Sequence, residues 1–306
     1  MIFLNEFKFL DINDAKLFMK YLGNYDFNTY EYSFLNLFLW RRYCKVEYSM
    51  VKNALIIKKD EEGKGSFFMQ PLGYSYKDLD DIIKELMKYK QKDNKMKFLF
   101  GDIEEPFLNI LKEKYGDGVE YYKDINNFDY IYETEKLINL KGDKLRKRKS
   151  QYNQFLMNYS FEVKDIHDED VRKDCIAYTK QWFINQPYKN NQLIYEAEGI
   201  EEVFNNLNVN DLNALGIAVY VNGGIAGFTI GEKVNSNMAI IHIEKGDTNY
   251  KGIYAFINRT FAEKYLKGIM YINRQEDIGI EGLKRAKLAY DPIRLEKKYL
   301  VNINEV

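Results

Sequence analysis

The chain contains few of the residues that build disulfide frameworks and metal centres. Its 306 residues include only 2 cysteines, Cys44 and Cys175, and 2 histidines, His167 and His242. Two cysteines are too few for a disulfide framework or a cysteine metal site, and two histidines argue against histidine-based zinc chemistry. We therefore expect a protein without a metal centre.

Long apolar runs and a charge excess are missing as well. The apolar runs fall far short of the ~18 residues that a membrane span needs, and Met1 opens no signal peptide. Lys and Arg together number 45 against 46 Asp and Glu, which gives a net charge of −1. This balance argues against a globally basic nucleic-acid-binding protein but leaves room for a local basic patch. We expect a soluble, cytoplasmic chain with no membrane span.

What the sequence does contain is the composition of a globular protein. Hydrophobic residues make up 46% of the chain and charged residues 30%, which excludes a wholly disordered chain. A length of 306 residues suits one large domain or two domains of about 150 residues each.

Apolar periodicity predicts nearly the same order of helices and strands in both halves of the chain. In the first half we expect strands at 7–10, 46–50, 55–58, 67–70, 96–100, 119–122 and 128–132, and helices at 13–22, 32–40, 76–89 and 107–115. In the second half we expect strands at 161–166, 215–221, 225–233, 238–244, 269–272 and 293–301, and helices at 169–183, 200–207, 252–267 and 280–288. Asn222-Gly223-Gly224 predicts a hairpin between two of these strands.

Both halves follow the order β-α-α-β-β-β-α-β-α-β, with one more strand at the end of the first. A helix over 141–159 is expected to connect them. We predict two mixed α/β domains, 1–140 and 141–306. Their likeness lies in element order, since no obvious residue-level repeat accompanies it.

Five stretches of the second half resemble a known family. They are 144–155 (KLRKRKSQYNQF), 224–232 (GIAGFTIGE), 241–247 (IHIEKGD), 271–277 (YINRQED) and 279–288 (GIEGLKRAKL). These stretches resemble uncharacterised bacterial proteins that are similar to the soluble C-terminal region of phosphatidylglycerol lysyltransferases. The first half matches mainly by element order.

The element order itself resembles the GCN5-related N-acetyltransferase (GNAT) fold, and its duplication resembles the Fem-type aminoacyltransferases. The resemblance implies a tandem GNAT-like fold with mixed sheets. In that fold the central strands part and an acyl donor enters between them. The implied reaction is acyl transfer.

Glu244 and His242 are the candidate catalytic pair. They alternate with Ile241 and Ile243 in a predicted strand, so they are expected on one face, about 7 Å apart. An attacking amine must lose a proton, and we expect Glu244 to be the general base, with His242 sharing that role or orienting Glu244. The alternative is a polar pair whose members satisfy each other beneath a helix.

Tyr290 follows the last predicted helix of the second half. The GNAT resemblance implies a tyrosine general acid in this part of the chain, which would protonate the leaving group. A chance match is the alternative, because the sequence contains 26 tyrosines.

A polar run that includes Asn273, Arg274 and Glu276 follows a buried strand. Polar residues at the carboxyl end of a central strand commonly line a crevice in α/β sheets, so we expect them to bind substrate. Arg274 suits a carboxylate or phosphate, and Glu276 with Asp277 suits an amine. Alternatively, Asp277 caps the next helix and Arg274 pairs with Glu276.

Asn249, Lys251 and Gly252 occupy the position of the GNAT phosphate loop, so the resemblance makes them candidate donor-binding residues. The usual signature there is Gln/Arg-x-x-Gly-x-Gly/Ala, because glycines let the backbone approach the pyrophosphate. Here only Gly252 remains, and Tyr254 stands where a small residue is expected. This departure argues against ordinary acetyl-CoA use, and Fem-type transferases likewise do not use CoA. The alternative is that Gly252 simply starts a helix.

Residues 141–149 hold six basic residues and one Asp. Such a cluster suits phosphates, including tRNA or a lipid head group, and the resemblance places it near the donor. Arg146 and Arg148 are therefore further candidate donor-binding residues. The alternative is a solvated helix face.

We expect an acyltransferase that moves an aminoacyl or related acyl group to an amine or hydroxyl. Two alternatives stay open: a CoA-dependent N-acetyltransferase with a degraded phosphate loop, and a non-catalytic small-molecule-binding protein of the same fold. Aminoacyl-tRNA and acyl-CoA are the candidate donor substrates, and no other cofactor is expected.

Overall fold

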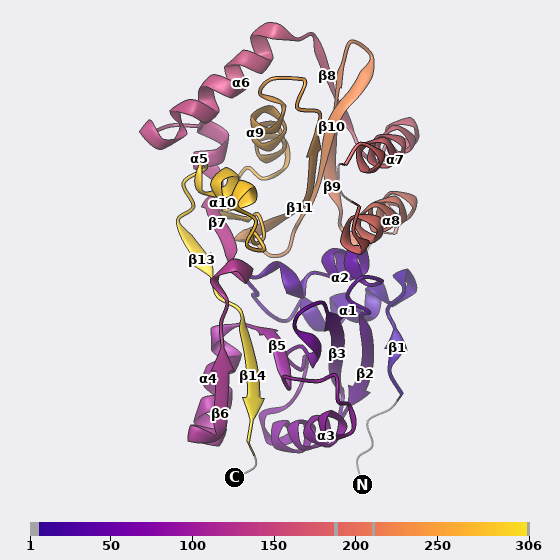
Figure 1. Cartoon of the computed structure of the whole chain (residues 1–306), viewed down its shortest axis with the longest axis vertical. Helices are drawn as coiled ribbons and strands as arrows, with labels where there is room; N and C mark the ends of the chain where they lie inside the picture. Colours follow the sequence, from indigo (N-terminus) through magenta and orange to yellow (C-terminus); the bar gives the residue numbers. More distant parts are fainter. Residues whose placement is uncertain (1–5, 187–188, 210–211, 305–306) are drawn as a thin grey trace. The chain divides into compact units, whose positions relative to one another are not determined.

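The computed structural model describes residues 6–186, 189–209 and 212–304. The chain forms two compact units, each with its own sheet (Figure 1). The first unit comprises Met1–Ile125 and Lys297–Val306, and the second comprises Asn126–Glu296.

In its described residues, the first unit is a seven-stranded mixed sheet with four α-helices. Its strands are β1 (Lys8–Phe9), β2 (Glu47–Val51), β3 (Ala54–Glu61), β4 (Gly65–Phe68), β5 (Phe100–Ile103), β6 (Val119–Tyr122) and β14 (Tyr299–Ile303). Its α-helices are α1 (Ala15–Leu22), α2 (Phe34–Trp40), α3 (Leu79–Lys92) and α4 (Glu105–Tyr115). The strand order is β1-β2-β3-β4-β5-β14-β6, and β4 and β5 run parallel.

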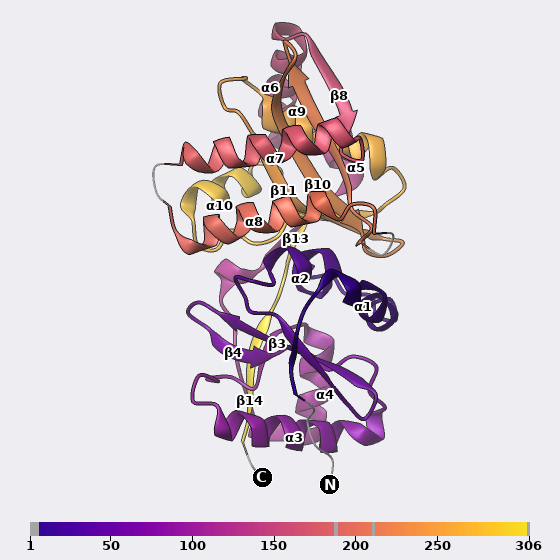
Figure 2. The same ribbon diagram turned by 90° about the vertical axis from the view of Figure 1, so that its right-hand side faces the viewer.

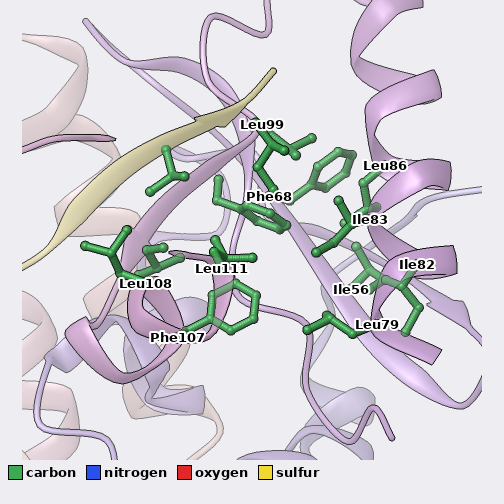
Figure 3. Packing of buried hydrophobic residues seen from close by; sticks show 14 of the residues in the cluster. Ile56, Phe68, Leu79, Ile82, Ile83, Leu86, Leu99, Phe107, Leu108 and Leu111 are labelled. Atoms are coloured by element: carbon green, nitrogen blue, oxygen red, sulfur yellow. The ribbon is translucent and has the colours of Figure 1, made fainter. Parts of the chain in front are cut away.

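The core of the first unit lies between the sheet and helices α3 and α4 (Figure 3). Helix α3 contributes Leu79, Ile82, Ile83 and Leu86, whose spacing of three, one and three places them on one face. That face packs against strand residues such as Phe68, and all four leucine and isoleucine side chains are fully buried. The apolar stripe predicted from the sequence is therefore the face that forms this core.

A buried ionic cluster lies elsewhere in the first unit. The Lys59 ammonium contacts Glu31 Oε2 at 2.7 Å and Asp102 Oδ2 at 2.8 Å, and it also contacts the Glu61 carboxylate. Lys298 donates to the other Glu31 oxygen at 3.1 Å. Buried charges are tolerated only when they are paired, so these contacts depend on one another.

The described part of the second unit also forms a seven-stranded mixed sheet. Its strands are β7 (Asp129–Glu133), β8 (Phe161–Asp165), β9 (Leu215–Val221), β10 (Gly224–Lys233), β11 (Met238–Gly246), β12 (Tyr271–Asn273) and β13 (Arg294–Glu296). Its α-helices are α5 (Thr134–Asn139), α6 (Arg146–Asn158), α7 (Glu169–Ile184), α8 (Asn191–Asn205), α9 (Ile253–Tyr265) and α10 (Glu281–Leu288). The strand order is β13-β7-β12-β11-β10-β9-β8.

Helices cover both faces of the second sheet. Helices α7 and α8 lie on one face, and α9 lies on the other together with α5 and α6 (Figures 1 and 2). Phe228 of β10 packs against Phe204 of α8 with ring centroids 5.4 Å apart. On the opposite face, α9 packs so closely that a Cβ at Gly231 would lie 3.0 Å from Phe261. The predicted hairpin between β9 and β10 is confirmed, with Asn222 and Gly223 both at positive φ.

Each sheet contains one strand from the other half of the sequence. Strand β14 lies between β5 and β6 in the first sheet, and β7 lies between β12 and β13 in the second. The structure therefore divides the chain differently from the predicted domains 1–140 and 141–306. The predicted strand 128–132 corresponds to β7, which pairs with β12 and β13, and the predicted strand 293–301 splits into β13 and β14.

The predicted fold class, a mixed α/β fold with two mixed sheets, is confirmed. Among the helices in the described part of the chain, none is both long and apolar enough to cross a membrane.

Candidate active site

The two central parallel strands of the second sheet, β11 and β12, pair over only part of the length of β11. Strands β11 and β12 pair only from Met238 opposite Tyr271 to Ile240 opposite Asn273. Beyond these pairs β12 ends, whereas β11 continues to Gly246. We call this region the fork: residues 241–246 of β11 and residues 274–277 after β12. Backbone pairing between these two strands therefore stops in the region where the resemblance implies that the central strands separate.

An ion pair bridges the fork. Arg274 Nη2 lies 3.1 Å from Glu244 Oε1, and Asn258 Nδ2 of α9 donates to Glu244 Oε2 at 3.3 Å. The Glu244 and Arg274 side chains are only 12% and 13% exposed. Each carboxylate oxygen has a second lone pair, so Glu244 can still accept a proton from a substrate while these contacts hold it in place.

Tyr290 lies beside this ion pair, between two guanidinium groups. The guanidinium carbon of Arg274 is 4.6 Å from the Tyr290 ring centroid, and that of Arg148 is 4.9 Å away. Burial raises the pKa of Tyr290, so its hydroxyl group stays protonated at neutral pH. Four predicted site residues thus come together here from separate elements: Glu244, Arg274, Tyr290 and Arg148.

His242 lies on the opposite face of the sheet from Glu244, so the predicted pairing of these two residues is wrong. The β10–β11 register shifts here, with Ile230 opposite Ile243 but Gly231 opposite Ile241. His242 is the extra residue of this β-bulge, and a bulge re-aims the side chains that follow it. Glu244 consequently reaches Asn258 of α9, whereas His242 does not.

Both ring nitrogens of His242 are engaged on its own face. Nε2 lies 2.8 Å from Glu232 Oε1, and Nδ1 lies 3.3 Å from the Gln275 amide nitrogen. The His242 side chain is fully buried. It therefore fixes the segment that follows β12, through Gln275, and holds no proton within reach of Glu244.

Asn273 and Asp277 make hydrogen bonds that hold the chain around the end of β12. Asn273 Nδ2 donates to Asp129 at 2.7 Å, and its side-chain oxygen accepts from the Gln275 backbone N–H at 2.7 Å. Asp277 accepts from the Gly279 backbone N–H at 2.8 Å, just before α10. Arg274 pairs with Glu244 across the fork, and the charge of Glu276 acts on Lys287.

The predicted donor-binding loop is covered by helix α6. Gly252 has a φ of 92°, and a Cβ there would lie 2.1 Å from the Gln151 carbonyl oxygen of α6. The Lys251 backbone N–H donates to the Tyr159 hydroxyl at 3.1 Å, and the Asn249 N–H donates to Asp247 at 2.9 Å. A glycine is thus required at 252 by the approach of α6, and these two N–H groups are already used within the chain.

The basic cluster points mostly outward. Lys141, Lys147 and Lys149 are exposed, and Arg146 is 82% exposed and pairs with Asp143 at 2.6 Å. Arg148 differs from its neighbours because its side chain turns toward Tyr290. The cluster therefore divides into an outer surface and one inward arginine.

Asn258 and Lys287 belong to the site but were not predicted from the sequence. Lys287 donates to the backbone carbonyl of Arg274 and to that of Gln275, the latter at 3.2 Å. Burial and the positive charge of Arg274 lower the pKa of Lys287 to about 8. Nothing in the sequence distinguishes Lys287 from Lys284 on the same short helix.

We predict that Lys287 titrates with a pKa of about 8, well below the 10.5 of an ordinary lysine. Its ¹³Cε NMR shift, assigned by loss of the signal in Lys287→Arg, should have a midpoint near pH 8. Because Arg274 contributes to the shift, Arg274→Met should move the midpoint upward. A midpoint above about pH 10 in the unmodified protein would show that Lys287 is not held in this environment.

Comparisons with known proteins agree with this fold. Over 99% of this chain and 100% of the other, the structure matches a conserved protein of unknown function from Bacteroides thetaiotaomicron, with a TM-score of 0.87 and 28% identity. L-PGS from Bacillus licheniformis matches over 97% of this chain and 93% of its own, with a TM-score of 0.63 and 14% identity. A tandem GNAT protein from the clavulanic acid biosynthesis pathway matches over 98% and 97%, with a TM-score of 0.50 and 8% identity.

The architecture is therefore that of a tandem GNAT-like protein. The family model described as "Phosphatidylglycerol lysyltransferase, C-terminal" matches residues 23–302. The chain belongs to this family, and the resemblance found in the sequence is confirmed.

Proposed function

We propose that the second unit is an acyltransferase that moves an aminoacyl group from an ester donor to an amine or hydroxyl. The observation that carries this proposal is the Glu244–Arg274 ion pair, which spans the fork where β11 and β12 part. A carboxylate and a guanidinium held at this position supply the two things that acyl transfer needs. These are a proton acceptor for the nucleophile and a positive charge for the developing oxyanion.

The chemical step follows from these two groups. The acceptor nitrogen or oxygen bonds to the acyl carbon while its proton passes to Glu244. The ester C–O bond of the donor then breaks, and Glu244 returns the proton to the leaving oxygen, so the carboxylate is restored. Arg274 stabilises the negative charge on the carbonyl oxygen between these two events.

A donor without CoA fits the second unit better than acetyl-CoA. In a GNAT-like site the pyrophosphate would be bound by backbone N–H groups where the helix after β11 begins. Here α6 packs against Gly252, and the N–H of Lys251 is taken by Tyr159. The family's name makes a lysyl group and phosphatidylglycerol the first acyl group and acceptor to test. Aminoacyl-tRNA is the donor class that the sequence suggests, and the outward lysines of 141–149 suit contact with tRNA phosphates.

The test is a transfer assay with tRNA charged with radiolabelled lysine. Phosphatidylglycerol vesicles and a soluble amine serve as alternative acceptors, and products are identified by chromatography and mass spectrometry. We expect a labelled product with at least one acceptor. No product with either, over a panel of charged tRNAs, would favour a non-catalytic binding protein.

A thermal-shift titration with acetyl-CoA separates the CoA-dependent alternative. A ligand at 100 times its Kd stabilises a protein by about 2.7 kcal/mol, so binding of millimolar acetyl-CoA would raise the melting temperature measurably. We expect no shift. A saturable rise in melting temperature would favour the N-acetyltransferase instead.

A further inference from the structure

Three buried polar groups around Tyr290 keep hydrogen atoms that no acceptor meets. Within the described residues, the Tyr290 hydroxyl, Arg274 Nη1 and Arg148 Nε have no partner at full hydrogen-bond geometry. Arg274 lies close enough to Tyr290 to donate a weak hydrogen bond to the phenol oxygen, but this contact leaves the phenol proton without an acceptor. Leaving a buried donor unsatisfied costs about 1–3 kcal/mol, and more for a charged group. Three such donors around one ring are therefore a strong indication that a ligand normally meets them.

The charges at this place are also unbalanced. Arg148 and Arg274 place two positive charges beside Tyr290. The Glu244 carboxylate, which is paired with Arg274 Nη2, contributes one negative charge. One additional anion would neutralise the group.

We propose that Arg148, Tyr290 and Arg274 form an oxyanion-binding subsite, which receives a phosphate or carboxylate group of the substrate. Two guanidinium N–H groups and one phenol O–H are all donors, and an oxyanion offers only acceptors. The proposal rests on the proposed function insofar as it assigns the anion to the substrate. The binding itself does not depend on turnover.

Movement of the Arg148 side chain could expose the subsite to an incoming anion. Its Nη1 donates to Gln151 at 2.7 Å, three residues along the same helix, and its guanidinium otherwise lies against the Tyr290 ring. Because the three donor atoms are covered in this structure, an incoming anion must displace a side chain. Rotation of the Arg148 side chain would admit the anion without movement of the sheet.

The test is a titration with anions in which binding is detected from shifts of the ¹⁵N–¹H NMR signals of the arginine Nε groups. The probes are inorganic phosphate, glycerophosphoglycerol as a phosphodiester, and acetate as a carboxylate. We expect a saturable shift of the Arg148 Nε signal with at least one probe. The probe that binds most tightly then identifies the substrate's anionic group.

Variants separate this subsite from general attraction to a basic surface. Arg148→Gln and Tyr290→Phe should each weaken binding about tenfold, which is the loss expected when one charge-assisted hydrogen bond is removed. Arg285→Gln, at an exposed arginine of α10, should leave binding within about twofold. No saturable shift with any probe, or an equal loss in Arg285→Gln, would overturn the subsite.

The outcome is distinguishable from a failure of the proposed function. Anion binding without acyl transfer would retain the subsite and refute the transferase. Acyl transfer without anion binding would retain the transferase and refute the subsite. Acyl transfer in a protein whose Arg148→Gln and Tyr290→Phe variants both bind the anion as tightly as the unmodified protein would lead to the same conclusion.

Discussion

Replacing Glu244 by glutamine should lower the turnover number of acyl transfer by at least about 100-fold. General acid–base groups contribute about 10²–10⁴ to a rate, and glutamine cannot take the acceptor proton. The amide keeps the shape of the side chain and can still accept from Asn258. We therefore expect the loss in kcat rather than in KM, measured in the lysyl-tRNA transfer assay.

Glu263→Gln provides the matched control for this variant. Glu263 lies on α9, as Asn258 does, but pairs only weakly with Lys267 at 4.0 Å. It should leave kcat within about twofold, since surface pairs of this kind contribute little. A folded Glu244→Gln variant, checked by near-UV circular dichroism, that retains more than a third of the activity would contradict the assignment of Glu244 as the proton acceptor.

Replacing Lys59 by methionine should destabilise the first unit by about 3–5 kcal/mol, the usual cost of leaving a buried charge uncompensated. The substitution would leave the carboxylates of Glu31, Glu61 and Asp102 close together, since their oxygen atoms lie within 4.8 Å of one another. Urea unfolding measures the loss. In a Trp182→Phe background, Trp40 of α2 is the remaining tryptophan and reports on this unit.

Lys45→Met is the control for the buried cluster. Lys45 also pairs with a carboxylate, Asp60 at 3.0 Å, but its side chain is 64% exposed. An exposed pair contributes about 0–1 kcal/mol, so this variant should barely shift the urea midpoint. A loss in Lys59→Met no larger than that in Lys45→Met would show that the cluster is not essential to the first unit.

The same cluster makes the folding stability of the first unit depend on pH in the acid range. Burial alone would raise the pKa of Asp102, but the charges of Lys59, Lys64 and Lys298 lower it instead. A carboxyl group whose pKa is lowered by folding stabilises the protein above the unfolded value of about 4, and this contribution is lost as the pH falls below it. Lys59→Met should therefore also weaken the decline in stability between about pH 5 and pH 2.

Elements with a long periodic pattern could be predicted from the sequence. The apolar face of α3, the helix at α9 and the β9–β10 hairpin all follow from spacing or from a turn that only a few residues favour. For helix α8 the apolar pattern predicts only 200–207, whereas the helix spans Asn191–Asn205. The signal for its true start is Asn190, whose side chain accepts from the Leu193 N–H.

The strand exchange between the two sheets could not be predicted from local pattern. Strand β7 (DYIYE) is buried along most of its length and β14 (YLVNI) is buried at every second residue, and neither pattern indicates which sheet the strand joins. Their place is decided by pairing partners far away in the sequence, such as β5 for β14. Element order alone consequently places the domain boundary about 15 residues too late.

The candidate site was partly predictable for a similar reason. Residue type and position after a strand identify Glu244 and Arg274, which the structure brings together. The bulge that separates His242 from Glu244 is a shift in register, and only the strand glycine Gly231 hints at it. Among the six basic residues of 141–149, no local signal indicates that Arg148 is the one that turns inward.

The most direct test of Glu244 and Arg274 as the acyl-transfer site is a crystal structure with a stable amide analogue of lysyl-adenosine bound. We predict that the analogue's carbonyl group enters the fork, with the leaving nitrogen within about 3 Å of the Glu244 carboxylate or one water away. An analogue bound at residues 247–252 instead, with the Glu244–Arg274 contact still at 3.1 Å, would contradict this assignment.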